Sequence, residues 1–386
     1  MVAVAGERSG QDPTTANTST AGEHVKRLSL AFVALAAWAC GGSNDSKSGN
    51  DTTHPVAAGT TSGADLNGAG ATFPNPIYSK WFPEYATKTG VKINYQPIGS
   101  GGGIKQLQEQ TVDFGASDAP MSDTELAAAK GGPVLHFPTV IGAVAIAYNL
   151  PEVQQQLKLT GPVLADIFLG KITKWNDSRI AALNNGVKLP ATDILVAHRS
   201  DGSGTTFIFS DYLSAVSPAW KTSPGKGKEL PWPVGIGGKG NDGVTGVIKQ
   251  TPGGIGYVEL AYAKQNQLPV ALLQNAAGQF VGPSVEGATA AAEGAMNALG
   301  GNTDYRVSIV NASGAQAYPI ASFTWLLVYK NMPDAAKAKK VADFVKWYLT
   351  SGESEVASLD YAPLPASLVA KLTARADSLT SGTAAK

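Results

Sequence analysis

The sequence has little cysteine, histidine and charge, and each shortage excludes a class of protein. Its 386 residues include one cysteine, so no disulfide can form within the chain. Four histidines are few for a zinc centre or a histidine-dependent hydrolase. Basic and acidic residues number 30 each, which gives no basic field for nucleic acid. With 43% hydrophobic residues and 44 glycines, the composition instead predicts two turn-rich α/β domains of ordinary size.

The N-terminal part of the chain has the pattern of a secretory signal. Lys26 and Arg27 precede an apolar run at 28–39, which would be about 18 Å long as a helix, too short for a bilayer core of about 30 Å. The run ends at Cys40 and resembles a bacterial lipoprotein signal, with this cysteine as the lipidated first mature residue. One departure is Ala37, where such signals usually have a leucine-like residue. Plain secretion or a buried free cysteine is the alternative.

The segments on either side of this signal are polar. Residues 1–23 lack periodicity, so we expect that translation begins near Val25 and that 1–39 is a misassigned start followed by the signal peptide. Residues 40–64 are rich in Gly, Ser, Thr, Asn and Asp. They predict a flexible tether, about 25 Å across as a random coil.

From residue 65 onward, helical and strand patterns alternate. Alternation of this kind predicts α/β units with mainly parallel sheets. The apolar stretch at 134–148 is interrupted by Pro138 and Gly142, which suggests buried strands near a crossover. We expect helices at 77–88, 103–110, 163–169, 205–213, 243–250 and 334–350, and strands at 91–97, 113–117, 194–197, 255–258 and 322–329.

Four polar or glycine-rich loops follow predicted strands or precede predicted helices. In α/β sheets, ligands bind at loops beyond the carboxyl ends of strands. The most informative loop sets the guanidinium of Arg199 beside Ser203, Gly204 and Thr205 at a predicted helix start, where backbone N–H groups suit an oxyanion. An ordinary capped helix is the alternative. The four loops are Gly68-Ala-Gly-Ala-Thr-Phe-Pro, Gly99-Ser-Gly-Gly-Gly, Ala116-Ser-Asp-Ala-Pro and Arg199-Ser-Asp-Gly-Ser-Gly-Thr-Thr.

These loops, in this order, resemble the phosphate-binding protein of the bacterial phosphate-specific ABC importer, the PstS family. The resemblance covers about residues 65–370 and extends beyond the loops. Further matching stretches are Gly115-Ala-Ser-Asp-Ala-Pro, Phe137-Pro-Thr-Val-Ile-Gly, Gly237-Gly-Lys-Gly-Asn-Asp-Gly, Gly256-Tyr-Val-Glu and Leu359-Asp-Tyr-Ala.

The resemblance implies which residues contact the anion. Asp201 matches the carboxylate that braces the arginine. One departure is Gly101, where many relatives have a second serine, and this puts one peripheral contact in doubt. The implied phosphate-binding residues are Thr72, Phe73, Ser100, Asp118, Arg199, Ser203, Gly204 and Thr205.

The resemblance also implies an α/β fold of the two-lobed, type II periplasmic-binding-protein kind, with the ligand cleft between the lobes. We expect lobe 1 to comprise 65–143 and 318–386 and lobe 2 to comprise 144–317, with crossings near Ala143 and Tyr318. The implied partners are inorganic phosphate, the permease subunits of an ABC importer and the membrane through a lipid anchor, on the outer face of the cell membrane. We expect a monomer without nucleic acid, cofactor, metal or catalytic residues.

Other functions stay open at the level of sequence. A phosphate-ester hydrolase is disfavoured because Gly-x-Ser-x-Gly is absent at Ser203 and Ser100, and His136 and His198 lie in apolar settings. The run 235–240 fits Gly-x-Gly-x-x-Gly, but no convincing strand precedes it, so we interpret it as structural. A binding protein for another oxyanion, such as sulfate, molybdate or phosphonate, and a surface phosphate sensor or adhesin are the remaining alternatives.

Overall fold

The computed structural model describes residues 66–295 and 304–381. The predicted start, signal peptide, lipidated Cys40 and tether at 40–64 lie outside the described residues. Within the described ranges, no helix is both long and apolar enough to cross a bilayer.

One eight-stranded sheet runs through the described part of the chain, in the order β2-β1-β3-β11-β4-β8-β6-β7. The strands β2, β1 and β3 are parallel and form the basis of what we call the first lobe, and β8, β6 and β7 are parallel and form the basis of the second lobe. The strand bounds are β1 Leu66–Gly70, β2 Ile93–Pro97, β3 Phe114–Ser117, β4 Val134–Tyr148, β6 Leu195–Arg199, β7 Ile236–Gly238, β8 Gly254–Glu259 and β11 Ala321–Tyr329.

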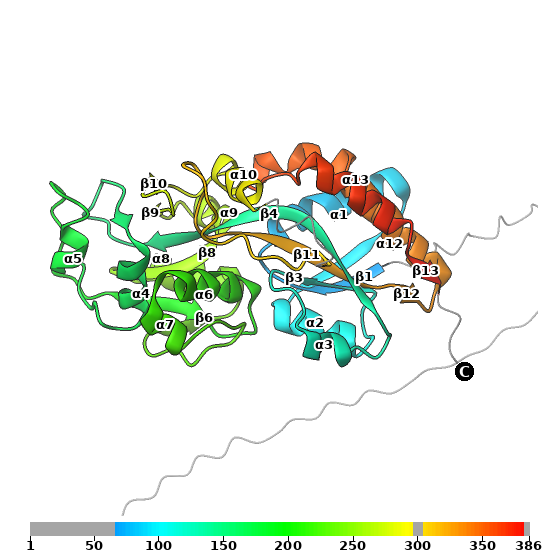
Figure 1. Ribbon diagram of the computed structural model, residues 1–386, viewed down its shortest axis with the longest axis horizontal. Helices are drawn as coiled ribbons and strands as arrows, with labels where there is room; N and C mark the ends of the chain where they lie inside the picture. The colour runs from blue at the N-terminus through cyan, green and yellow to red at the C-terminus, as the bar shows by residue number, and fades with distance from the viewer. Residues whose placement is uncertain (1–65, 296–303, 382–386) are drawn as a thin grey trace, which may run out of the picture. The chain divides into compact units, whose positions relative to one another are not determined.

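The centre of this sheet is antiparallel, because β11 pairs antiparallel with both β3 and β4, and β4 pairs antiparallel with β8. The expectation of mainly parallel pairing is therefore wrong for these strands. The physical reason is that β4 leaves the first lobe and continues into the second, whereas β11 begins where the chain returns to the first lobe, so each runs against its neighbours (Figure 1).

The predicted interruptions of the 134–148 stretch do not break the strand. β4 is continuous, and next to Pro138 the register with β11 shifts by a bulge, with Thr324 opposite Val140 and Trp325 opposite Pro138. A bulge accommodates the missing N–H of proline within a ladder. From Val144 onward β4 pairs with β8 instead of β11, so one strand serves both lobes.

Helices cover the sheet in both lobes, and the small strands form two further sheets (Figure 1). The first lobe carries α1 Asn75–Thr89, α2 Ser100–Gln108, α3 Asp123–Ala127, α12 Ala335–Tyr348, η1 Ser351–Glu355, η2 Ala357–Leu359, α13 Ala366–Ala376, β12 Asn331–Met332 and β13 Thr380–Ser381. The second lobe carries α4 Gly161–Phe168, α5 Ser178–Ala181, α6 Gly204–Val216, α7 Pro218–Thr222, α8 Gly240–Gln250, α9 Leu260–Gln265, α10 Val285–Gly294, β5 Lys158–Leu159, β9 Leu272–Gln274 and β10 Phe280–Val281.

Aromatic side chains fill the core on each side of the crossing strands. In the first lobe, Trp81 of α1 stacks on Tyr348 of α12 with ring centroids 5.3 Å apart. In the second lobe, Phe209 of α6 stacks on Tyr257 of β8 at 4.3 Å. Offset stacking of this kind contributes beyond simple burial. It fixes α6 on the sheet, and with it the loop that precedes the helix.

Two predicted helices begin earlier than expected. α2 starts at Ser100 rather than 103, and α8 starts at Gly240 rather than 243. Both starts are rich in glycine, which has a low helix propensity, so the local sequence pattern predicts helices that are three residues too short at their N-termini. The earlier starts move the first N–H groups of both helices next to the loops singled out above.

Candidate functional site

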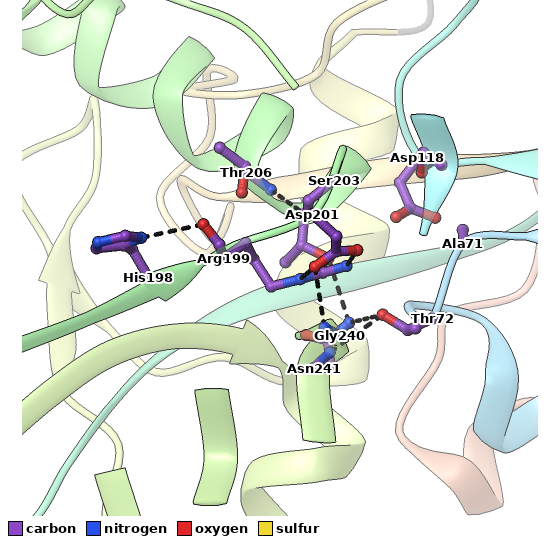
Figure 2. Close-up of polar contacts among 12 residues, drawn as sticks. Ala71, Thr72, Asp118, His198, Arg199, Asp201, Ser203, Thr206, Gly240 and Asn241 are labelled. Atoms are coloured by element: carbon purple, nitrogen blue, oxygen red, sulfur yellow. Dashed lines mark hydrogen bonds and ion pairs between the residues drawn. The ribbon is translucent and has the colours of Figure 1, made fainter. Parts of the chain in front are cut away.

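Three of the loops lie side by side in the first lobe. β1 is flanked by β2 and β3 in a parallel arrangement, so the carboxyl ends of the three strands share one edge. Thr72 and Phe73 follow β1, Ser100 follows β2 as the first residue of α2, and Asp118 follows β3. Figure 2 shows Asp118 on the side facing Arg199 and Ser203 of the second lobe, and Thr72 joined by hydrogen bonds to Asn241.

Ser100 and Asp118 are fully buried and bonded to each other. The Asp118 backbone N–H donates to Ser100 Oγ at 3.2 Å. Thr324, on the crossing strand β11, donates its hydroxyl hydrogen to Asp118 Oδ1 at 2.8 Å. Side-chain capping does not explain these positions, because α2 has Gly99 as its N-cap and the next helix, α3, is capped by Ser122.

The pKa of Asp118 is raised to about 7. Burial is the main cause, and the hydrogen bond from Thr324 and the positive charge of Arg199 oppose it only in part. A carboxyl group with this pKa changes its protonation near neutral pH. It is suited to share a hydrogen with a ligand that itself exists in several protonation states.

Arg199 ends β6 and is buried within the second lobe. Its Nε donates to Asp201 Oδ1 at 2.8 Å, and its Nη2 lies 2.5 Å from Asp201 Oδ2, so the carboxylate holds the guanidinium in a fork (Figure 2). Nη1 donates to the Thr205 hydroxyl at 3.3 Å. The side chains of Arg199 and Asp201 are 1% and 13% exposed, which excludes a loose surface ion pair.

Asp201 itself is fixed from two sides. The Gly240 N–H at the start of α8 donates to Asp201 Oδ1 at 2.9 Å. Burial raises the pKa of Asp201, but the bonds from Arg199 and Gly240 outweigh it, so the pKa lies below its usual value. The carboxylate therefore stays ionised and offsets part of the charge of Arg199.

The start of α6 points its first N–H groups toward the first lobe. Ser203 is the N-cap, and its hydroxyl accepts from the Thr206 N–H at 3.0 Å. Gly204 lies so close to the first lobe that a Cβ there would be 2.5 Å from Ser100 Oγ and 2.6 Å from Asp118 Oδ2. The predicted residues of the two lobes thus converge on one place.

Asn241, on α8, joins the two halves of this site, and sequence reasoning missed it. Its backbone N–H and its Nδ2 donate to the Thr72 hydroxyl at 3.2 and 2.9 Å, and its Nδ2 also donates to the Thr205 hydroxyl at 3.2 Å (Figure 2). The run 235–240, interpreted as structural, contains β7 and leads directly to Asn241. The sequence pattern that could have identified Asn241 is Gly240-Asn-Asp, which overlaps the end of that run and starts a helix.

Other predicted features lie outside this contact network. His198 is directed away from Asp118, stacks on Trp232 at 4.7 Å and contacts the Arg199 carbonyl oxygen at 3.0 Å (Figure 2). His136 is buried, accepts from the Met121 N–H at 3.0 Å and lies 2.7 Å from an Asp304 oxygen. Within residues 66–295 and 304–381, no group of three or more His, Cys, Asp or Glu side chains could hold a metal ion.

Gly101, where many relatives have a second serine, contacts the second lobe. The Gly101 N–H donates to the Gly202 carbonyl oxygen at 2.8 Å, and a Cβ at 101 would be 3.1 Å from Gly202 Cα. A side chain here would have to displace the neighbouring backbone slightly. Position 101 therefore affects how closely the two lobes approach each other.

Comparisons with known proteins show which family the chain belongs to. Residues 55–351 match the PBP superfamily domain. The phosphate-binding protein PstS of Xylella fastidiosa strain 9a5c is 49% identical over 344 residues, covering 87% of this chain and 92% of that protein. The protein of the same name from Methanocaldococcus jannaschii is 38% identical over 361 residues, covering 86% and 91%.

Solved structures share the fold. The phosphate-bound periplasmic phosphate-binding protein PfluDING aligns with a TM-score of 0.62 at 24% identity, covering 81% of this chain and 93% of that one. The phosphate-binding protein from Stenotrophomonas maltophilia aligns with a TM-score of 0.64 at 20% identity, with the same coverage. The predicted two-lobed α/β fold is confirmed, and the chain belongs to the PstS family of phosphate-binding proteins within the PBP superfamily.

Proposed function

We propose that this chain captures inorganic phosphate between its two lobes. The anion would lie where the loops after β1, β2 and β3 meet the end of β6 and the start of α6. Asp201 would brace the arginine rather than touch the ligand. The residues proposed to contact phosphate are Thr72, Phe73, Ser100, Asp118, Arg199, Ser203, Gly204 and Thr205.

The observation that carries this proposal is a buried guanidinium and a buried carboxyl group facing each other beside the starts of α2 and α6. Helix N-termini and a guanidinium stabilise an anion. Micromolar binding requires about 8 kcal/mol, and several charge-assisted hydrogen bonds at about 1.5–3 kcal/mol each can supply it after the cost of association.

Asp118 gives the site its proposed selectivity. Phosphate near neutral pH still carries a hydrogen, which it can donate to a carboxylate, whereas sulfate carries none. Two acceptors facing each other in a buried site repel. A site built around such a hydrogen bond rejects the analogue that lacks it by about 10⁴-fold or more.

We infer that the ligand holds the lobes closed. Contacts that cross between the lobes, such as Asn241 to Thr72 and Gly101 to Gly202, surround the proposed site. The change of β4 pairing partner between Ala143 and Val144 supports a lobe boundary there, with 65–143 and 318–386 as lobe 1 and 144–317 as lobe 2. Ligand bridging both lobes favours the closed state.

The wider setting follows from the family and stays a proposal. We place the protein outside the cytoplasm, as a monomer anchored through a lipid on Cys40, delivering phosphate to the permease of an ABC importer and performing no catalysis.

Labelling with a radioactive fatty acid tests the anchor, since a Cys40→Ser variant should lose the label. Steady release of product from a phosphate ester by the purified protein would contradict the absence of catalysis.

Calorimetry with phosphate, arsenate and sulfate tests the central proposal. We expect phosphate and arsenate to bind one per chain, and sulfate not to bind at equal ionic strength. Tight sulfate binding would show instead that the chain serves another oxyanion.

A further inference from the structure

Three buried side chains form a hydrogen-bonded group at the loop between β1 and α1, which contains Thr72 and Phe73. Tyr262, on α9, donates its hydroxyl hydrogen to the Thr72 carbonyl oxygen at 2.6 Å. Tyr361, two residues after η2, donates to the Phe73 carbonyl oxygen, also at 2.6 Å. Glu259, the N-cap of α9, is fully buried, and its Oε2 lies 3.1 Å from the Tyr361 hydroxyl. We call Glu259, Tyr262 and Tyr361 the carbonyl latch.

Within the latch, Tyr262 acts on the peptide group that the proposed site uses. The Thr72 carbonyl and the Phe73 N–H belong to one planar peptide unit, so fixing the carbonyl also fixes the direction of the N–H. A hydrogen bond accepted by the carbonyl also polarises the unit and strengthens the N–H as a donor. Tyr262 can therefore affect the anion without touching it.

The latch connects the two lobes. Glu259 and Tyr262 follow β8 in the second lobe, while Thr72, Phe73 and Tyr361 belong to the first lobe. Glu259 also pairs with Val144 at the point where β4 changes partner, and its N–H donates to Asn241 Oδ1 at 2.9 Å. The latch thus lies between the crossing strand and the residue that bridges Thr72 and Thr205.

The hydrogen-bond distances favour a hydrogen on Glu259. Tyr361 has a single hydroxyl hydrogen, and the shorter bond directs it to the Phe73 carbonyl, which can only accept. The 3.1 Å contact with Glu259 is then satisfied only if the carboxyl group donates to Tyr361. Glu259 Oε2 also accepts from the Ala261 N–H at 2.9 Å, whereas Oε1 has no hydrogen-bond partner among the described residues. A buried charge with one oxygen unpaired would be strongly unfavourable.

We propose that Tyr262 of the carbonyl latch positions the Phe73 N–H for phosphate, that Tyr361 fixes the adjoining Phe73–Pro74 peptide unit, and that Glu259 serves in the latch as a neutral acid that donates its hydrogen to Tyr361. This inference rests on the proposed phosphate function. Ionised Glu259 would instead attract the hydroxyl hydrogen of Tyr361 and weaken its bond to the Phe73 carbonyl.

The surroundings of Glu259 favour the neutral form. Burial raises the pKa of Glu259 well above its usual value, and the nearby acids Asp360 and Asp118 raise it further, whereas the bond from the Ala261 N–H lowers it. Lys264 of α9 is paired with Asp360, and Arg199 of β6 with Asp201. Apart from the latch residues themselves, the charged groups that face the latch from the neighbouring elements are Asp118, Asp242, Asp360 and Arg199.

The first test separates positioning from stability. Tyr262→Phe removes the bond to the Thr72 carbonyl and should raise the Kd for phosphate about fivefold to tenfold. Tyr329→Phe is the matched control, because the Tyr329 hydroxyl donates to the Leu107 carbonyl at 2.8 Å in a buried position away from the site. Both variants should lower the melting temperature, but only Tyr262→Phe should change the Kd. Equal Kd values for the two variants would overturn the positioning role.

The second test concerns the hydrogen on Glu259. The melting temperatures of the phosphate-free wild-type protein and Glu259→Gln are compared from about pH 5 to about pH 9. A carboxyl group that stays neutral when folded and ionises when unfolded binds more hydrogen in the folded state, so wild type should lose stability relative to the Gln variant as pH rises above 4.5. A constant difference would show that Glu259 is ionised in the folded protein and would overturn this part of the proposal.

The two tests fail in distinguishable ways. If the wild-type protein does not bind phosphate, the proposed function is wrong, and the melting comparison still reports the hydrogen on Glu259. If Glu259→Gln does not fold, infrared spectroscopy of wild type at pH values near 8 replaces the comparison. A carbonyl band of protonated carboxylic acid, unchanged in Asp118→Asn, supports the neutral acid, and its absence contradicts it.

Discussion

At the scale of single residues, the charge of the proposed site depends on how Arg199 is held. Asp201 fixes one side of its guanidinium in a fork, and Asp201 is fixed in turn by the N–H of Gly240. The carboxyl group of Asp118 comes from the other lobe and completes the pair of opposite charges around the anion. Each of these three side chains therefore has a different function, and each substitution should have a different effect.

Removing the guanidinium should have the largest effect on affinity. Arg199→Ala deletes the charge and leaves Asp201 buried without its partner, so we expect the Kd for phosphate to rise by about 10²–10⁴-fold. Arg179→Ala is the control, because Arg179 pairs with Asp166 and Asp177 on the surface of the second lobe. Calorimetry that finds Arg199→Ala within a few-fold of wild type would rule out a direct role.

Replacing the carboxyl group of Asp118 should change selectivity more than affinity. Asp118→Asn keeps the shape but can donate as well as accept, so it removes the repulsion of sulfate, and the preference for phosphate over sulfate should fall by at least about tenfold. Titration of both anions at one ionic strength measures the ratio of the two Kd values. An unchanged ratio would assign the discrimination to another residue.

Asp118 should also make the stability of the free protein depend on pH. Its pKa is raised from 3.8 to about 7, so its favourable contribution is fully present below about pH 3.8 and is lost as pH rises through about 7. Without phosphate, wild type should therefore melt lower at pH 8 than at pH 5 relative to Asp118→Asn, with a loss in the free energy of unfolding on the order of 2 kcal/mol. Parallel melting curves across this range would contradict the raised pKa.

At the scale of elements, helix starts supply most of the proposed backbone donors. α2 and α6 both begin where the lobes meet, and the first N–H groups of a helix have no acceptor within it. The sequence places the start of α6 within one residue, because Ser203 is a standard capping residue before an apolar helix. It places α2 and α8 three residues late, because their glycines obscure the helical pattern.

The close approach at α6 predicts that one methyl group is enough to disturb binding. Gly204→Ala places a Cβ 2.5 Å from Ser100 Oγ, so the lobes cannot close fully, and the Kd for phosphate should rise by at least about tenfold. Gly246→Ala in α8 is the matched control, because a Cβ there meets nothing within 4 Å. Equal phosphate affinities for the two variants would argue against closure at this point.

At the scale of the whole molecule, the two lobes share one sheet through β4 and β11. Several contacts that join them lie around the proposed site, among them Thr72 with Asn241 and Gly101 with Gly202, and others, such as the ion pair of Lys264 with Asp360, lie elsewhere between the lobes. A ligand in this place would bind the closed arrangement and hardly bind the unfolded chain. Stability and binding should therefore be linked.

Phosphate should raise the melting temperature in proportion to the logarithm of its concentration. At about 100 times the Kd, the free energy of unfolding should increase by about 2.7 kcal/mol. Differential scanning calorimetry with phosphate, and with sulfate at the same ionic strength, measures the effect. A similar rise with sulfate would indicate a general salt effect and not a specific site.

Features that depend on local chemistry can be predicted from the residues alone: the alternation of elements, the capped start of α6, and the polar loops after strands. Contacts between residues far apart in the chain became visible only in the folded protein. Asn241 and Tyr262 meet Thr72 across the lobe boundary, and Thr324 and Tyr361 return from the C-terminal part of the chain to meet Asp118 and Phe73 within the first lobe. A side chain's neighbours across a lobe boundary are set by the path of the whole backbone, and no local pattern records that path.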